Sequence, residues 1–329
     1  MLQRFMLDSK KVNRMATLAI LPLMVVVIMA GTRGSSAKRE PPEAPTEGTL
    51  MVANLRDESL TIHPLASLAA PITLLLGGAP HELALANGRL YASLPREESV
   101  IEIDPRAPGI LRTLTIAGQP HGLTTAPDGR TLFATTDTGN ELVRLALSGF
   151  ERTASWPTGS TPHGVAISGD LAFVVDARDR ALRRIDLATG ESQTTPAGIM
   201  PESVTIAGDH VVVADAASGR VYWFTKELKL AGGVELGGVP VRVVTINAQT
   251  VAVAQNEAGQ VAIIDLATGE VVRELKVAGR PDGLCLSPSG RFLGIVSNDH
   301  DSVHIFRTSD WKVMLTLATG DGPGACAWQ

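Results

Sequence analysis

The chain of 329 residues has few aromatic side chains, only 4 % of the total, and only two cysteines. Long stretches of alanine, glutamate, lysine and leucine at helical spacing are missing, while 32 glycines interrupt runs of valine, isoleucine and leucine. Short strands joined by tight turns fit this composition better than helices do. The sequence also has no GxGxxG, Walker, GxSxG or CxxC motif, so it has none of these signatures of nucleotide binding, serine hydrolysis or thiol redox chemistry.

Positive charge is also scarce, because the net charge of the chain is −5. Without its first 37 residues the chain would keep 24 basic and 33 acidic residues, a net charge of −9. So acidic a surface repels nucleic acid and anionic lipid, and no basic stripe with interleaved aromatic residues is present. We therefore expect no nucleic-acid partner, and membrane contact only through the N-terminal segment.

The N-terminal segment has the order of an export signal. Four basic residues, Arg4, Lys10, Lys11 and Arg14, precede an uncharged run over residues 15–32, and Ser35-Ser36-Ala37 offers a small-x-small cleavage site. The run also reaches the lower length limit of a membrane-spanning helix. We expect residues 1–37 to be a signal peptide or an uncleaved membrane anchor rather than a buried core helix.

Export follows from both readings of that segment, so we expect the protein to be periplasmic, secreted or anchored at the outer face of the cytoplasmic membrane. The next residues, 38–48, read KREPPEAPTEG and are charged and rich in proline. Such a composition cannot bury an apolar core and predicts a disordered linker.

A repeat organises the remaining chain, residues 49–329. Prolines recur in steps of 40, 42, 39, 39, 41 and 42 residues, at Pro80, Pro120, Pro162, Pro201, Pro240, Pro281 and Pro323. A period of about 40 residues is the size of a four-stranded propeller blade. The unit after Pro120 shows the pattern, with strands HGLTTAP, RTLFATT, ELVRLAL and ERTASWPT separated by turn residues.

The two ends of the repeat region complement each other. After Pro323 only one strand's worth of residues remains, whereas residues 49–65 match a second and third strand and residues 70–76 a fourth. Strands from both termini would close a seventh blade and leave no open sheet edge. We predict an all-β, seven-bladed β-propeller whose seventh blade is closed by both termini, and not an open solenoid.

These repeats resemble the YVTN-type β-propeller repeat proteins, which include the periplasmic YncE-like group. The resemblance is carried by the Pro-x-x-Leu/Val opening of the units, the turns Pro127-Asp-Gly129 and Pro288-Ser-Gly290, LMVAN at 50–54, and IDLATGE at 185–191 and 264–270. The tetrapeptide that names the family is absent. The resemblance implies the propeller fold and an exported location, but no particular activity.

The residue after each repeat proline is the candidate for function, because the first strand of a blade lies innermost. Seven such residues would surround one mouth of the central channel: His81, His121, His163, Glu202, Val241, Asp282 and Gly324. The ligand candidates among them are His81, His121, His163, Glu202 and Asp282. The three histidines could bind a divalent metal, zinc or copper, and activate a water for lyase or hydrolase chemistry.

The Pro-His-Gly phrases are similar to those of streptogramin lyases, and peptidyl-hydroxyglycine lyases bind zinc through propeller histidines. Those resemblances imply an enzyme. The tryptophan-rich phrases of the streptogramin lyases are missing, however, and Glu82 stands where glycine follows the other two histidines. The alternative role is architectural, since a histidine at a strand start can bond to the neighbouring blade and lock the two units together.

The two cysteines lie on the inner strands of neighbouring blades, Cys285 four residues after its proline and Cys326 three residues after its own. Side chains alternate between the faces of a strand, so the two point to opposite faces of their blades, and those faces could be the ones that meet. We expect a disulfide across the closing joint, which the oxidising export compartment allows. The alternative is two small apolar core residues.

Taken together, the sequence favours a binding or interaction protein over an enzyme. It would be an exported, monomeric ring that presents loops and a channel mouth to a protein or small-molecule ligand. The alternatives are a metal-dependent lyase or hydrolase that uses the histidine cluster, and a propeller subunit beside a redox partner. No residue is singled out as catalytic.

Overall fold

Twenty-eight strands and no helix make up the part of the chain that the computed structural model describes, residues 45–67 and 69–329. The predicted signal or anchor, residues 1–37, lies outside the described residues, as do residues 38–44 of the predicted linker. No helix long and apolar enough to cross a membrane occurs in the described ranges.

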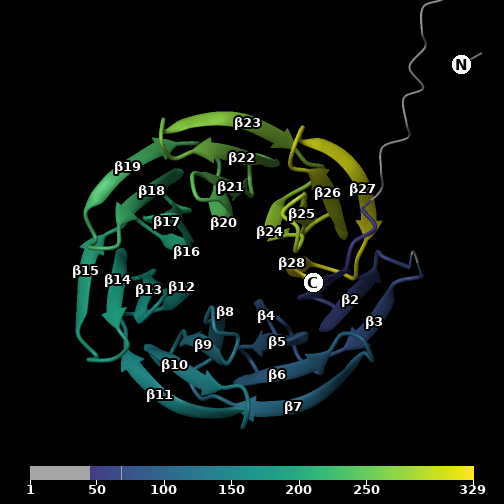
Figure 1. Ribbon diagram of the computed structural model, residues 1–329, viewed down its shortest axis with the longest axis horizontal. Helices are drawn as coiled ribbons and strands as arrows, with labels where there is room; N and C mark the ends of the chain where they lie inside the picture. Colours follow the sequence, from purple (N-terminus) through teal and green to yellow (C-terminus); the bar gives the residue numbers. More distant parts are fainter. Residues whose placement is uncertain (1–44, 68) are drawn as a thin grey trace, which may run out of the picture. The chain divides into compact units, whose positions relative to one another are not determined.

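The strands form seven four-stranded antiparallel sheets, one for each blade, and Figure 1 shows these sheets in a ring. Blades one to three consist of β4 (Leu83–Ala86), β5 (Arg89–Leu94), β6 (Ser99–Asp104), β7 (Gly109–Thr115); β8 (Pro120–Thr125), β9 (Thr131–Thr136), β10 (Glu141–Ala146), β11 (Glu151–Pro157); and β12 (Pro162–Ser168), β13 (Leu171–Asp176), β14 (Ala181–Asp186), β15 (Ser192–Pro196). Blades four to six consist of β16 (Pro201–Ala207), β17 (His210–Asp215), β18 (Arg220–Thr225), β19 (Leu230–Glu235); β20 (Pro240–Asn247), β21 (Thr250–Gln255), β22 (Gln260–Asp265), β23 (Glu270–Lys276); and β24 (Pro281–Leu286), β25 (Phe292–Ser297), β26 (Ser302–Arg307), β27 (Lys312–Ala318).

Blade seven combines both ends of the described chain. Its order is β28-β1-β2-β3, with β28 (Pro323–Trp328) paired to β1 (Thr49–Asn54), followed by β2 (Ser59–Pro64) and β3 (Ile72–Leu75). Two further backbone bonds extend the joint, since the amide of Thr49 donates to the carbonyl of Gln329 at 2.7 Å and the reverse bond is 3.1 Å. The seven-bladed propeller closed by both termini, predicted from the repeat, is confirmed.

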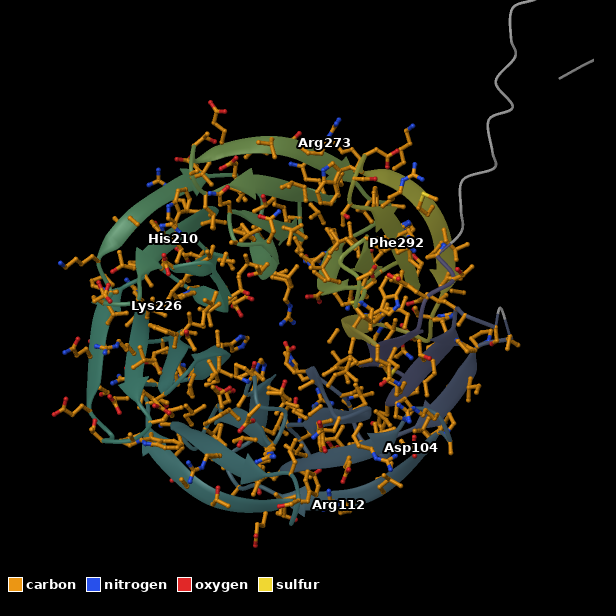
Figure 2. All side chains as sticks on the ribbon, in the orientation of Figure 1. Asp104, Arg112, His210, Lys226, Arg273 and Phe292 are labelled. Atoms are coloured by element: carbon orange, nitrogen blue, oxygen red, sulfur yellow. A yellow bond between two sulfur atoms is a disulfide. The ribbon has the colours of Figure 1, made fainter. Side chains whose placement is uncertain are left out.

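Burial follows the position of a strand within its blade. The second strands are buried on both faces because neighbouring blades cover them, which explains apolar runs such as the HVVVAD of β17. The outer strands are largely exposed, as in β23, and Figure 2 shows Arg112 and Arg273 at the rim of the ring. The core is therefore a set of apolar clusters, several of which combine strands from adjacent blades.

The two IDLATGE phrases form the same turn between the third and fourth strands. Asp186 Oδ1 accepts bonds from the amides of Ala188 and Thr189, both at 2.9 Å. The amide of Gly190 then donates to the carbonyl of Asp186, and Gly190 has a φ of 79°, a backbone conformation that glycine adopts at little cost. Asp265 and Gly269 repeat this arrangement. Aspartate and glycine in these phrases therefore have turn-forming roles.

The disulfide joins Cys285 on β24 to Cys326 on β28, with the two Cα atoms 5.6 Å apart. It lies in an apolar cluster with Phe292 and Trp328, whose rings stack with centroids 6.2 Å apart. The last strand of the chain is thus held covalently by blade six as well as by its hydrogen bonds to β1.

Candidate functional site

The inner strands of the blades surround a cavity of about 380 Å³ where these strands begin. Six of the seven residues that follow a repeat proline line it: His81, His121, His163, Glu202, Val241 and Asp282. The seventh, Gly324, lies beside the cavity, because a Cβ atom on this glycine would be 4.0 Å from Asp282 Oδ2. All five ligand candidates from the sequence therefore share one cavity.

The backbone of two of the histidines ties neighbouring blades together. Ser93 on β5 donates a hydrogen bond to the carbonyl of His121 at 2.8 Å, and Thr135 on β9 donates to the carbonyl of His163 at 2.7 Å. The blades approach so closely that a Cβ atom on Gly122 would lie 2.2 Å from the carbonyl oxygen of His163. The glycine of this Pro-His-Gly phrase is therefore needed for blade packing, while the imidazole rings line the cavity.

The three imidazoles lie next to one another across blades one to three, with neighbouring rings tilted by 43° and 39°. The ring centroids of His81 and His121 are 3.7 Å apart and those of His121 and His163 are 3.9 Å apart. Burial lowers the pKa of His81 to about 4, and burial with the neighbouring His81 and His163 lowers the pKa of His121. Both rings are therefore neutral at neutral pH. Their Nδ1 atoms are buried and have no hydrogen-bond partner.

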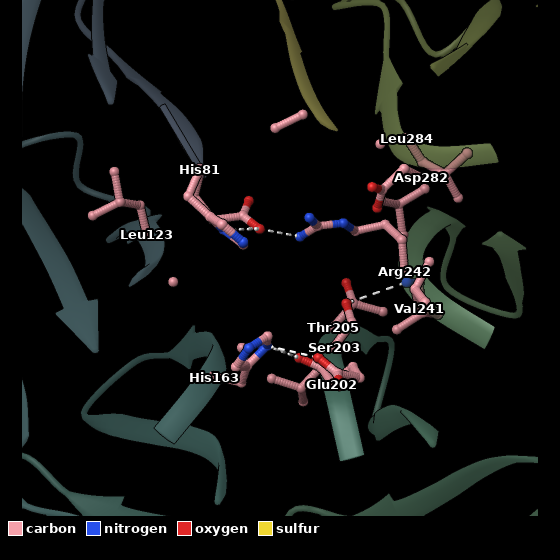
Figure 3. Close-up of a pocket in the computed structure, with 18 of the residues that line it drawn as sticks. His81, Leu123, His163, Glu202, Ser203, Thr205, Val241, Arg242, Asp282 and Leu284 are labelled. Carbon is pink, nitrogen blue, oxygen red and sulfur yellow. Dashed lines mark hydrogen bonds and ion pairs between the residues drawn. The ribbon is translucent and has the colours of Figure 1, made fainter. Parts of the chain in front are cut away.

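His163 differs from the other two because it is paired with blade four. Its Nδ1 lies 2.9 Å from Glu202 Oε2 and 3.3 Å from the Glu202 carbonyl. Burial opposes the charged imidazole, but the hydrogen bond and the charge of Glu202 outweigh it and raise the pKa of His163. Burial likewise opposes the charged carboxylate, yet His163 outweighs it and lowers the pKa of Glu202. This ion pair joins two adjacent blades at the mouth, as Figure 3 shows.

Two further charged residues in the cavity were missed by reasoning from the residue after each proline. Arg242 on β20 pairs with Glu82, with Nη1 2.5 Å from Oε1 (Figure 3). Both stand two residues after a repeat proline, a position that otherwise carries only small residues: Gly122, Gly164, Ser203, Gly283 and Ala325. The sequence did contain a signal for this pair: two opposite charges stand at a repeat position that small residues otherwise occupy.

Asp282 lies on the same side of the cavity as Arg242 (Figure 3). Burial raises its pKa to about 6, Arg242 acts in the opposite direction, and Glu82 and Glu202 raise the pKa further. No described residue forms a hydrogen bond or ion pair with the Asp282 side chain in the structure. The anion of Asp282 is thus the least stabilised charge in the cavity.

The predicted metal ligands can be compared with the geometry that a metal requires. Within the residues that the structure describes, no group of three or more histidine, cysteine, aspartate or glutamate side chains is arranged to hold a metal ion. The His81 and His121 rings are in contact and tilted by 43° to one another, and His163 is paired with Glu202. A shared metal would require these rings to turn.

Comparison with known proteins gives a family and a fold. The family described as outer membrane protein assembly factor BamB matches residues 96–285, more than half of the chain. No curated protein matches the sequence.

Solved structures of similar fold have low sequence identity to this chain. A functionally unknown protein from Desulfotomaculum acetoxidans DSM 771 has a TM-score of 0.74 at 16 % identity, covering 86 % of this chain and 99 % of its own. A streptogramin B lyase structure has a TM-score of 0.67 at 13 % identity, covering 75 % and 86 %. The hydrazine synthase of Kuenenia stuttgartiensis has a TM-score of 0.67 at 18 % identity, covering 75 % and 88 %. At these identities the likeness extends to the fold alone.

Proposed function

The chain belongs to the β-propeller family described as outer membrane protein assembly factor BamB, and we propose that it is an exported binding protein whose channel mouth holds a small-molecule ligand. The ring supplies a rigid frame, and residues from all seven blades line one cavity. The family's name refers to the outer membrane, which agrees with the export predicted from residues 1–37. Within propellers we assign the chain to the YVTN-type, YncE-like repeats on its turn and strand phrases.

The observation that carries this proposal is the set of buried polar atoms without partners in the cavity wall. His81 Nδ1 and His121 Nδ1 are buried and make no hydrogen bond to any described residue. Leaving such an atom unsatisfied costs on the order of 1–3 kcal/mol. A ligand toward which the rings turned these atoms would recover that cost, and a cavity of about 380 Å³ is within the size range of small-molecule sites.

A variant that fills the cavity tests the proposal. Gly324 has no atom closer than 4.0 Å to its would-be Cβ and has an ordinary φ, so Gly324→Phe would project into the mouth without backbone strain. Gly109→Phe is the matched control, because Gly109 begins the outer strand β7 and its would-be Cβ is 3.6 Å from the nearest atom.

Each protein is incubated with a small-molecule extract of cells and medium and examined by native mass spectrometry. We expect adducts of defined mass on the wild type and on G109F, and none on G324F. Equal spectra for all three proteins would contradict a binding site at the mouth.

A metal-dependent lyase or hydrolase using His81, His121 and His163 is the second candidate, favoured by the two buried histidine nitrogens, His81 Nδ1 and His121 Nδ1, that make no hydrogen bond. Elemental analysis of protein purified without a His-tag tests it. Stoichiometric zinc or copper that is lost in the triple alanine variant would support the enzyme. Metal-free protein, with the triple variant merely less stable, would support the architectural role.

A further inference from the structure

Five charged groups line the cavity, and four of them form two ion pairs. Arg242 and Glu82 form one ion pair at 2.5 Å, and His163 and Glu202 form a second at 2.9 Å. Both pairs bring together opposite charges, so each is close to neutral overall. Asp282 is the fifth charged group in the lining, and it has no paired partner among the described residues. With His163 protonated, the form that Glu202 favours, the lining carries an uncompensated charge of one negative unit when Asp282 is ionised.

No cation of the described structure is in ion-pair contact with Asp282. Arg242 and Arg280 act on its charge from a distance, but Arg242 is paired with Glu82, and Arg280, which does not line the cavity, donates from Nε to Asn256 Oδ1 at 2.7 Å. The carboxylates Glu82 and Glu202 repel its charge, and its raised pKa, about 6, agrees with this geometry. A buried carboxylate in such a position gains more from an added cation than an exposed one does.

A second observation points to a ligand in the same cavity. His121 is only 8 % exposed, lines the cavity, and has an Nδ1 atom with no partner in the described structure. His81 Nδ1 also makes no hydrogen bond, although Glu82 Oε1 lies 3.8 Å from it and the side chain is 34 % exposed. The mouth thus has an acidic wall at Asp282 and a wall of neutral imidazoles on blades one to three, as Figure 3 shows for Asp282 and His81.

We propose, on the basis of the binding function above, that the mouth binds a small organic monocation, a primary ammonium or a guanidinium compound, with its cationic group on Asp282. A second polar group of the same ligand would bond to the Nδ1 atoms of His81 and His121 after these rings turn toward the cavity, because both atoms are buried in the structure. With His163 protonated, a single positive charge neutralises the lining, whereas a divalent ion would leave a surplus positive charge beside the Arg242 guanidinium.

The test uses full-length protein and saturation-transfer NMR with four separate probes: ethanolammonium, methylguanidinium, acetate and zinc ion. Because zinc ion gives no proton signal, its binding is measured by displacement of a cationic probe. Asp282→Asn removes the charge at constant shape. Asp170→Asn is the matched control, because Asp170 is an exposed carboxylate at a turn whose side chain has no partner in the described structure. G324F reports whether binding occurs at the mouth.

We expect both cationic probes to bind the wild type and D170N, to bind D282N with an affinity lower by about tenfold or more, and not to bind G324F. The inference is overturned if acetate or zinc binds at the mouth in place of the cations, or if D282N binds the cations as well as the wild type does. If a ligand from the extract is retained while no cation binds, only the inference about its charge fails. If G324F changes neither experiment, the proposed function fails as well.

Discussion

The guanidinium of Arg242 reaches across the channel mouth to the carboxylate of Glu82, joining blade five to blade one with Nη1 2.5 Å from Oε1. The two side chains are only 21 % and 14 % exposed. This ion pair connects two blades that are not adjacent in the ring, and it orients the guanidinium beside Asp282.

Removing one member of the Arg242–Glu82 ion pair leaves a buried charge without its partner. We expect Arg242→Met to lower the free energy of unfolding by roughly 3 kcal/mol, measured by urea denaturation. Glu82→Gln in the same chain should restore part of the loss, because it removes the stranded carboxylate. Equal and additive effects of the two substitutions would show that the pair is not energetically coupled.

The His163–Glu202 pair makes stability depend on pH. The raised pKa of His163 means that its contribution is full below the ordinary value of 6.5 and is lost as the pH rises through the folded-state pKa. The lowered pKa of Glu202 means that its contribution is present above the ordinary value of 4.5 and is lost as the pH falls through the folded-state pKa. Melting temperatures should therefore show a plateau between about pH 4.5 and pH 6.5, and Glu202→Gln should remove it. An unchanged profile in E202Q would count against the pair.

Asp282 acts in the opposite sense on stability. Because its pKa is raised from 3.8 to about 6, the folded protein is favoured below pH 3.8 by this group, and that contribution is lost as the pH rises through about 6. We expect Asp282→Asn to stabilise the ligand-free protein above pH 6 by up to about 3 kcal/mol. Chemical denaturation at acidic and neutral pH measures it, and a destabilised D282N at neutral pH would show that the carboxylate has a structural partner.

The disulfide closes a separation of 41 residues and anchors the last strand. In the chain-entropy description, removing a cross-link of this length costs about 4 kcal/mol. Cys285→Ala with Cys326→Ala, or reduction of the wild type, should lower the urea midpoint accordingly. Two reactive thiols in denatured, unreduced protein would instead show that the bond does not form.

The glycines of the inner strands differ sharply in the space around them. Gly122→Ala would place a Cβ atom 2.2 Å from the carbonyl oxygen of His163, whereas Gly324→Ala meets nothing closer than 4.0 Å. We expect the first substitution to cost more than about 2 kcal/mol or to prevent folding, and the second to change stability by less than about 0.5 kcal/mol. Similar thermal unfolding of the two variants would contradict the close blade contact.

The fold of residues 49–329 was predictable because each blade repeats one local pattern of strand, turn and proline, and because the partial units at residues 49–76 and 323–329 add up to one blade. Local spacing also placed His81, His121, His163, Glu202 and Asp282 at one mouth, since residues at equal positions in equal units meet around a common axis. The positions of Cys285 and Cys326 on neighbouring inner strands predicted a disulfide but left two unpaired core residues as the alternative, and the structure contains the disulfide.

The pairing of charges at the mouth was decided only by the tertiary structure. Glu82 and Arg242 are 160 residues apart in the sequence, and no local pattern says which carboxylate a guanidinium reaches across a ring. The same holds for the state of each histidine, because burial keeps His81 and His121 neutral whereas Glu202 favours the charged form of His163. The sequence repeat determines the backbone position of each residue around the channel. The charge and the partners of its side chain depend on distances and burial that exist only once the ring has closed.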